Sequence, residues 1–381
     1  MGALSGLRVV EIAGLGPAPF CGMLLADMGA EVVLVERSAG GDPLALGSNA
    51  IINRGKRSVA LDLKNPAGVD AVLRLVDGAD VLIEGMRPGV MERLGLGPDA
   101  CLARNPRLVY GRMTGWGQDG PLAQAAGHDI NYIALSGALW FSGAPGQPPM
   151  APPTLVGDLG GGALYLAMGL LAALLSARQT GVGQVVDAAV VDGSANLMNL
   201  LLSAHAAGQQ PFERGRGLLD GPHWYGAYAC ADGHFVTVGA LEPQFNALLF
   251  ARLGLGDDPE FRKAYDSRSW PVLRSRLAAV FASQPRSHWV ALLEGTDACF
   301  AGVLTPAEGL SHPHLVARGV YSVRDGVLQA APAPRFSVTP SSVPGPVPVR
   351  GADGAAVLRE AGLSESAIAA LLGAETRGAL G

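Results

Sequence analysis

The feature that most constrains the fold is a regular alternation of apolar, strand-like runs with helix-like segments through the first half of the chain. Between the strand-like runs, the sequence has the pattern of amphipathic or apolar helices. Strands that alternate with helices at this spacing are typical of a parallel sheet whose two faces are both covered by helices. The sequence therefore predicts an α/β fold. The strand-like runs are residues 7–14, 31–37, 58–63, 80–86 and 107–117.

A second, smaller unit is predicted from residue 225 onward. Residues 225–240 have the pattern of a hairpin closed by Asp232-Gly233, and three helix-like segments follow, which indicates an α+β unit. Residues 331–350 are rich in proline and are expected to be extended. We divide the chain into a large domain (1–190, completed by 331–381), a linker (191–224), a small domain (225–312) and a return linker (313–330).

Composition excludes several classes of protein. Charged residues make up 16% of the 381 residues and the net charge is -5, so the chain is globular and lacks the basic footprint of a nucleic-acid-binding protein. Four cysteines lie far apart without a metal-ligand pattern, which predicts free thiols in a reducing compartment, the cytoplasm, and no metal site. Arg8 and Glu11 interrupt the first apolar run, unlike the core of a secretory signal.

Residues 159–177 form an uncharged run that is long enough for a membrane span. The run is rich in glycine and alanine, which contribute little transfer energy, and no basic or aromatic belt flanks it. We therefore expect a helix buried on all sides within a protein that does not enter a membrane.

The segment Gly14–Pro19 with Glu36 imitates a dinucleotide-binding fingerprint. Its third glycine is missing, however, and Pro17 and Pro19 remove two backbone N–H groups that a pyrophosphate would need. A nicotinamide oxidoreductase is therefore a disfavoured alternative.

Basic residues gather between Arg54 and Lys64, and further arginines follow the strand-like runs. Ligands of an open parallel sheet bind at the carboxyl ends of its strands, where arginine and lysine can meet phosphates by charge-assisted hydrogen bonds. The alternative is a solvated basic face without a ligand. The residues concerned are Arg37, Arg54, Lys56, Arg57, Lys64, Arg87 and Arg93.

Two similar turns place an ionisable residue after a glycine at a predicted helix start: Gly127-His128 and Gly157-Asp158. The helix macrodipole would keep Asp158 ionised and His128 neutral, so both could act as bases near neutral pH. Glycines 160–162 would let a ligand approach the backbone, whose N–H groups could stabilise an enolate oxygen. An ordinary N-cap is the alternative for Asp158.

Glu242 follows the second strand of the predicted hairpin. Its carboxylate could orient His128 through the other ring nitrogen, or it could simply cap the next helix.

Taken in order along the chain, these segments resemble the family III CoA-transferase (CaiB/BaiF) superfamily, and within it the branch of α-methylacyl-CoA racemases. The match covers nearly the whole chain and includes GHDINY at 127–132 and VGDLGGG at 156–162. Other matching segments are 4–14, 29–37, 53–64, 81–97, 111–121, 183–194, 228–245 and 332–337.

The resemblance implies a Rossmann-like large domain, a smaller α+β domain and an interlocked homodimer. It implies an isomerase of lipid metabolism that interconverts (2R)- and (2S)-2-methylacyl-CoA thioesters, with no cofactor because CoA is part of the substrate. His128 and Asp158 would be the two bases, and Glu242 would support His128 from the same chain or the partner chain. The residues implied to contact CoA are Arg37, Leu61, Lys64, Gly85, Met86, Arg87, Arg93, Gly127, Asp129, Ile130, Asn131 and Tyr132.

His128 separates the two branches of the superfamily. A transferase would use Asp158 as the nucleophile of an acyl-aspartyl intermediate, whereas a 1,1-proton transfer requires a base on each face of the α-carbon. The racemase is the leading hypothesis, the CoA transferase is the second, and a non-catalytic acyl-CoA-binding protein is the third.

Overall fold

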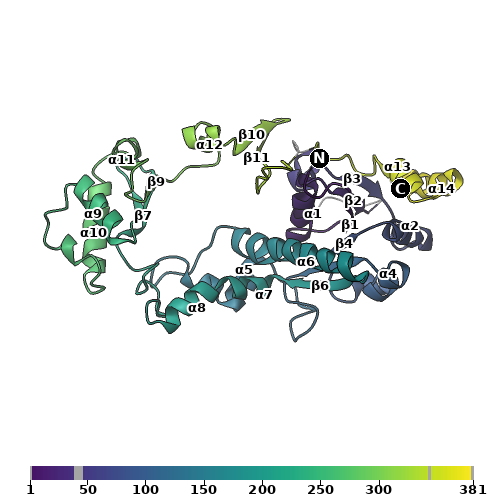
Figure 1. The fold of residues 1–381 in the computed structure, drawn as a ribbon, viewed down its shortest axis with the longest axis horizontal. Helices are drawn as coiled ribbons and strands as arrows, with labels where there is room; N and C mark the ends of the chain where they lie inside the picture. The colour runs from purple at the N-terminus through teal and green to yellow at the C-terminus, as the bar shows by residue number, and fades with distance from the viewer. Residues whose placement is uncertain (1, 38–45, 342–344, 379–381) are drawn as a thin grey trace. The chain divides into compact units, whose positions relative to one another are not determined.

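The computed structural model describes residues 2–37, 46–341 and 345–378 (Figure 1). Contacts divide the chain into two units, Met1–Ala138 with Ala151–Leu197 and Gly319–Gly381, and Leu139–Met150 with Met198–Arg318. We call them the large unit and the small unit.

The large unit is built on a six-stranded parallel sheet in the order β3-β2-β1-β4-β5-β6. The predicted α/β class with a parallel sheet is confirmed, and every strand-like run of the first half is a strand of this sheet. The strands are β1 (Arg8–Ile12), β2 (Glu31–Glu36), β3 (Arg57–Ala60), β4 (Val81–Glu84), β5 (Val109–Thr114) and β6 (Gln184–Ala189).

Helices cover both faces of the sheet because successive strand residues point to opposite sides. On one face, Val9 packs with Leu25 of α1 (Pro17–Asp27) and Leu170 of α6 (Leu164–Thr180). On the other face, Val10 packs with residues of α2 (Pro66–Asp77), α4 (Pro98–Arg104), α13 (Gly354–Glu360) and α14 (Glu365–Gly378), the last two of which are yellow in Figure 1. Shorter helices of this unit are α3 (Val90–Arg93), α5 (Asp129–Ser136) and α7 (Val190–Leu197).

The uncharged run does not form a single α-helix. Leu155–Ala163 is a π-helix that continues into α6, and together they make a 26-residue helix long and apolar enough to cross a membrane by length and composition. The prediction of burial on all sides is wrong. Leu166, Leu170 and Leu174 enter the core, but Met168 on the other side is 60% exposed. A continuous apolar run predicts a helix without indicating which of its faces is covered.

The small unit has an antiparallel sheet, β7 (Tyr225–Ala229), β8 (Phe235–Gly239) and β9 (Phe300–Gly302). The predicted hairpin is present, with Gly233 at a positive φ in its turn. The three predicted helices are also present. The helices of this unit are α8 (Asn199–Ala206), α9 (Pro243–Arg252), α10 (Trp270–Phe281), α11 (Arg286–Leu293) and α12 (Pro313–Ala317).

The predicted return linker, 313–330, contains regular structure. It includes α12 and a hairpin of β10 (Tyr321–Arg324) and β11 (Val327–Ala330). Arg54 donates to Gln329 Oε1 at 3.0 Å and to the Ala330 carbonyl at 2.8 Å, which joins β11 to the N-terminal part of the large unit. The described part of 331–350 contains neither helix nor strand, as predicted.

Candidate functional site

The carboxyl edge of the sheet has a topological switch between β1 and β4, where the order of the strands reverses. Loops on either side of such a point diverge and leave room for a ligand. The predicted CoA contacts lie around it: Arg37 directly follows β2, Lys64 lies between β3 and α2, and Gly85–Arg87 directly follows β4.

Four cations at this edge are exposed and carry no ion pair within the described residues. They are therefore free to receive the phosphates of a nucleotide-like ligand. The four are Arg37, Lys64, Arg87 and Arg93. Leu61, by contrast, is buried in the core, so that only its backbone can meet a ligand.

The basic cluster just before and at the start of β3 is structural, and both interpretations offered for it are wrong. Lys56 donates to Glu11 Oε1 at 2.8 Å, and neither side chain is exposed. Arg54 pairs with buried Asp27 at 2.6 Å, and Arg57 pairs with Glu31 and Glu360. The sequence could not reveal these pairs because the carboxylates come from distant parts of the chain.

His128 is the N-cap of α5, as predicted, with an extended backbone (φ −136°, ψ 173°) and an exposed side chain. Its backbone N–H donates to Asn131 Oδ1 at 3.0 Å, and its carbonyl accepts the first N–H bonds of the helix. Asn131 therefore fixes the entry of the chain into α5. The first turn also presents N–H groups that the helix itself does not use.

Asp158 lies in the first turn of a helix, close to a helix start as predicted, but it is not the N-cap offered as the alternative. The helix begins earlier, and Asp158 lies inside the π-helix, whose N-cap is Thr154 in the left-handed region (φ 62°). A β-branched residue rarely adopts this conformation, and residues held in such conformations cluster at functional sites. The Thr154 hydroxyl donates to Asp158 Oδ2 at 2.9 Å. A Cβ on Gly16, after β1, would lie 3.4 Å from the same oxygen.

Burial raises the pKa of the Asp158 carboxyl above its ordinary value. The Thr154 hydrogen bond lowers this pKa, the Asp129 charge raises it, and the His128 charge lowers it. Asp129 also accepts the Asp158 N–H at 2.8 Å, which ties α5 to the π-helix. The structure thus brings His128, Asp129 and Asp158 together. The helix macrodipole predicted a strongly ionised carboxylate at Asp158, whereas burial makes this carboxylate more basic.

Tyr132 and Trp116 form an aromatic contact beside this group. Their rings meet edge to face with centroids 4.7 Å apart, and the Tyr132 hydroxyl donates to the Gly127 carbonyl. Gly115 and Gly127 lie so close to Tyr132 that a side chain at either position would overlap it. Asp158 and Arg87 both act on the pKa of Tyr132, which burial raises. Tyr132 is therefore close enough to both the predicted base Asp158 and the predicted CoA contact Arg87 to be affected by their charges. Sequence reasoning missed Trp116 and Thr154, because neither carries a local signal of its role.

The glycines after Asp158 have a different role from the predicted one. Gly161 packs against the backbone and hydroxyl of Ser194 in α7, and Gly162 packs against Val190 and Pro17. Both glycines are buried, so they allow close helix packing rather than the approach of a ligand. Ile130, in the first turn of α5, is 56% exposed.

Glu242 is the N-cap residue of α9 in the small unit, without a side-chain capping hydrogen bond. Its charge raises the pKa of Tyr265, after the larger effect of burial, and it also acts on Cys299. The carboxylate is exposed and available for a partner. Its support of His128 stays a prediction.

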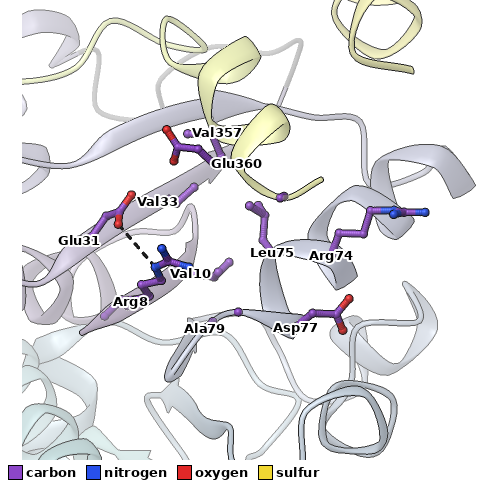
Figure 2. A pocket seen from close by; sticks show the side chains of 13 residues that line it. Arg8, Val10, Glu31, Val33, Arg74, Leu75, Asp77, Ala79, Val357 and Glu360 are labelled. Carbon is purple, nitrogen blue, oxygen red and sulfur yellow. Dashed lines mark ion pairs between the residues drawn. The ribbon is translucent and has the colours of Figure 1, made fainter. Parts of the chain in front are cut away.

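A cavity of about 330 Å³ lies at the amino edge of the sheet (Figure 2). Arg8 and Glu31, the first residues of β1 and β2, stand at its rim 3.9 Å apart. None of the predicted catalytic or CoA-binding residues lines it. The other rim charges are held in ion pairs, Arg74–Asp70, Asp77–Arg104 and Glu360–Arg57. The candidate site is therefore the carboxyl edge.

Comparison with known proteins gives consistent results. The model of the family described as CoA-transferase family III matches residues 4–354. Alpha-methylacyl-CoA racemase from Mus musculus is 45% identical over 370 residues, covering 96% of this chain and 95% of the mouse protein. The Homo sapiens racemase is 43% identical, covering 89% and 88%. The crystal structure of a CAIB/BAIF family protein from Brucella suis superposes with a TM-score of 0.81 at 28% identity, covering 94% and 99%.

Proposed function

This chain belongs to CoA-transferase family III, and on that basis we propose that it is a racemase that interconverts (2R)- and (2S)-2-methylacyl-CoA thioesters. The observation that carries the proposal is the grouping of His128 with the half-buried Asp158 at the carboxyl edge of the sheet. The mouse and human racemases that this chain resembles give the substrate class.

In the proposed reaction, one base removes the proton from the α-carbon and the electron pair moves into the thioester carbonyl to form an enolate. The conjugate acid of the other base then returns a proton to the opposite face. The raised pKa of Asp158 brings its basicity closer to that of an imidazole, which suits two groups that exchange roles in the two directions. The free N–H groups in the first turn of α5 are donors suited to the enolate oxygen.

Arg37, Lys64, Arg87 and Arg93 are proposed to hold the phosphates of CoA. They are exposed, unpaired within the described residues and located after successive strands of one sheet edge. Gly85, Met86 and Gly127–Tyr132 would meet the rest of the thioester. In this scheme CoA belongs to the substrate and no resident cofactor takes part.

A homodimer is part of the proposal. Leu164, Met168 and Leu175 of α6 are each at least half exposed, as are Ile130 and Leu135 of α5. Several large apolar side chains exposed on two helices favour an interface with another chain. A second copy would cover these faces and contribute Glu242 to His128. Light scattering on the purified protein would give twice the chain mass, and a monomer that racemises at full rate would contradict this proposal.

We also propose a cytoplasmic location without nucleic-acid or membrane partners. The net charge of -5 and the four free cysteines support it. Fractionation of cells that produce the protein tests the location, and recovery in the membrane pellet would contradict it.

The second candidate is a CoA transferase in which Asp158 attacks the thioester and carries the acyl group. The name of the family supports this candidate, and Asp158 fits either chemistry. His128 favours the racemase, because acyl transfer to a carboxylate does not use a second base.

One experiment separates the two functions. A single enantiomer of a 2-methylacyl-CoA is incubated with the enzyme in D2O, with and without a second carboxylic acid. Deuterium at the α-carbon with loss of stereochemistry, independent of the acid, supports the racemase. CoA appearing on the added acid without α-proton exchange supports the transferase and overturns the proposal.

A further inference from the structure

Three charged side chains form a row across the strands β4, β5 and β6 at the carboxyl edge. Glu84 and Arg112 are partners in the register of β4 and β5, and Arg112 and Asp187 are partners in β5 and β6. Side chains at one register position of a parallel sheet point to the same face. Glu84 is fully buried and Arg112 is 8% exposed.

Arg112 connects β5 to two other elements. Its Nε donates to Glu84 Oε1 at 3.0 Å, and its Nη1 lies 2.8 Å from Glu92 Oε1 in α3. The planar guanidinium can hold two carboxylates in fixed directions, which a lysine ammonium cannot reproduce. The neighbour of Glu92 along α3 is Arg93, one of the proposed CoA contacts.

The two acidic ends of the row each hold a loop of the candidate site. Glu84 Oε2 accepts the backbone N–H of Met86 at 2.7 Å, in the loop that carries Arg87. Asp187 Oδ2 accepts the N–H of Gln118 at 3.3 Å, in the loop that carries Trp116. Burial raises the pKa of Glu84, and Arg112 lowers it, so Arg112 helps to keep the carboxylate charged as an acceptor.

We infer that Arg112 is a positioning residue for CoA binding, which acts through Glu84, Glu92 and Asp187 to fix the loops after β4 and β5 and the helix α3. Burying charged groups costs desolvation free energy that their mutual attraction often does not offset, so stability alone is a weak reason for this row. The contacts of Arg112 with Glu84 and Glu92 instead converge on the segments that hold Arg87 and Arg93. The charge of Arg112 also lowers the pKa of Asp187, whose carboxylate holds the loop of Trp116. The inference rests on the proposed assignment of this edge to CoA.

The test uses the full-length protein and free CoA as the probe. Arg112→Lys keeps the charge and loses the double attachment, and Glu92→Gln breaks only the link to α3. Asp77→Asn is the matched control, because it breaks an arginine–carboxylate pair at the other edge of the sheet. Calorimetric titration gives the Kd of CoA, and hydrogen exchange reports on the peptides 84–93 and 115–120.

We expect Arg112→Lys to raise the Kd of CoA by about tenfold, a loss comparable to that of one charged contact. Both peptides should exchange faster, while kcat at saturating acyl-CoA stays within about twofold. Glu92→Gln should have a smaller effect of the same kind and be confined to peptide 84–93, and Asp77→Asn should change neither quantity.

An unchanged Kd in Arg112→Lys would overturn the inference even if the loops exchange faster, and so would an equal rise in Asp77→Asn. If Arg112→Lys does not fold, Glu92→Gln decides by the same two measurements, because Glu92 is exposed at the surface. Wild-type protein that binds CoA but fails to exchange the α-proton would refute the proposed racemase, and the CoA titrations would still decide the role of Arg112.

Discussion

Lys56 and Lys64 lie on either side of strand β3, yet their side chains have opposite surroundings. Lys56 is fully buried and bound to Glu11, whereas Lys64 is exposed and has no ion pair within the described residues. The same division separates Arg54, Arg57 and Arg112 from Arg37, Arg87 and Arg93. A cation that stabilises the fold has a carboxylate from the same chain, and a cation available to a ligand has none.

The largest expected effect on stability comes from breaking the buried ion pair of Lys56 and Glu11. Lys56→Met leaves Glu11 in the core without a counter-charge and should lower the free energy of unfolding by about 3–5 kcal/mol. Chemical denaturation measures this loss. The double variant Glu11→Met/Lys56→Met should recover most of it, and Lys64→Met should stay within about 0.5 kcal/mol of wild type. A Lys56→Met protein as stable as the wild type would remove the distinction between the two groups.

His223 is a buried base without a carboxylate partner in the described part of the chain, and it can be compared directly with Lys56. His223 in the small unit is fully buried, its ring stacks on Phe250, and neither ring nitrogen has a hydrogen-bond partner among the described residues. Burial lowers its pKa to about 4, with a smaller contribution from Arg274. Among the described residues, buried bases are therefore either paired, like Lys56, or neutral, like His223.

The sign of the pH effect follows from that pKa. The unfolded chain takes up the proton first, at pH about 6.5, so stability is complete above this pH and is lost as the pH falls toward 4. The loss is on the order of 3 kcal/mol at the acid end. Urea midpoints from pH 7 to pH 4 should fall less steeply for His223→Phe than for wild type. If the urea midpoints of His223→Phe and wild type fall equally steeply with pH, His223 does not take up a proton on unfolding.

The smallest effect on stability is expected when an exposed cation without an ion pair among the described residues, such as Arg87, is replaced. The same substitution should have a large effect on the binding of acyl-CoA. Arg87→Ala should raise the KM for acyl-CoA by about tenfold, with kcat within about twofold and unfolding free energy within about 0.5 kcal/mol. The matched control is Arg104→Ala, whose guanidinium pairs with Asp77 at the other edge of the sheet. Steady-state kinetics and denaturation of both variants measure the contrast. An equal KM in the two variants would contradict the proposed CoA edge.

The contrast also explains what the sequence could predict. The strands were predictable because their apolar runs and turns are local, and so was the start of α5 at His128. The pairing of Arg54 was not, because its partners Asp27 and Gln329 lie 27 and 275 positions away in the sequence. Asp158 was predicted at a helix start and lies in the first turn of one, but the sequence did not indicate that the helix is a π-helix capped by Thr154, whose backbone conformation its residue type does not suggest.

The central claim is that His128 and Asp158 serve opposite faces of the α-carbon. The measurement that tests it most directly is deuterium uptake from D2O by each enantiomer of a 2-methylacyl-CoA, in the presence of His128→Gln or Asp158→Asn. We predict that neither variant racemises, and that each exchanges the α-proton of only one enantiomer, the opposite one in the two variants. Equal exchange of both enantiomers by either variant, or continued racemisation, would contradict the two-base account.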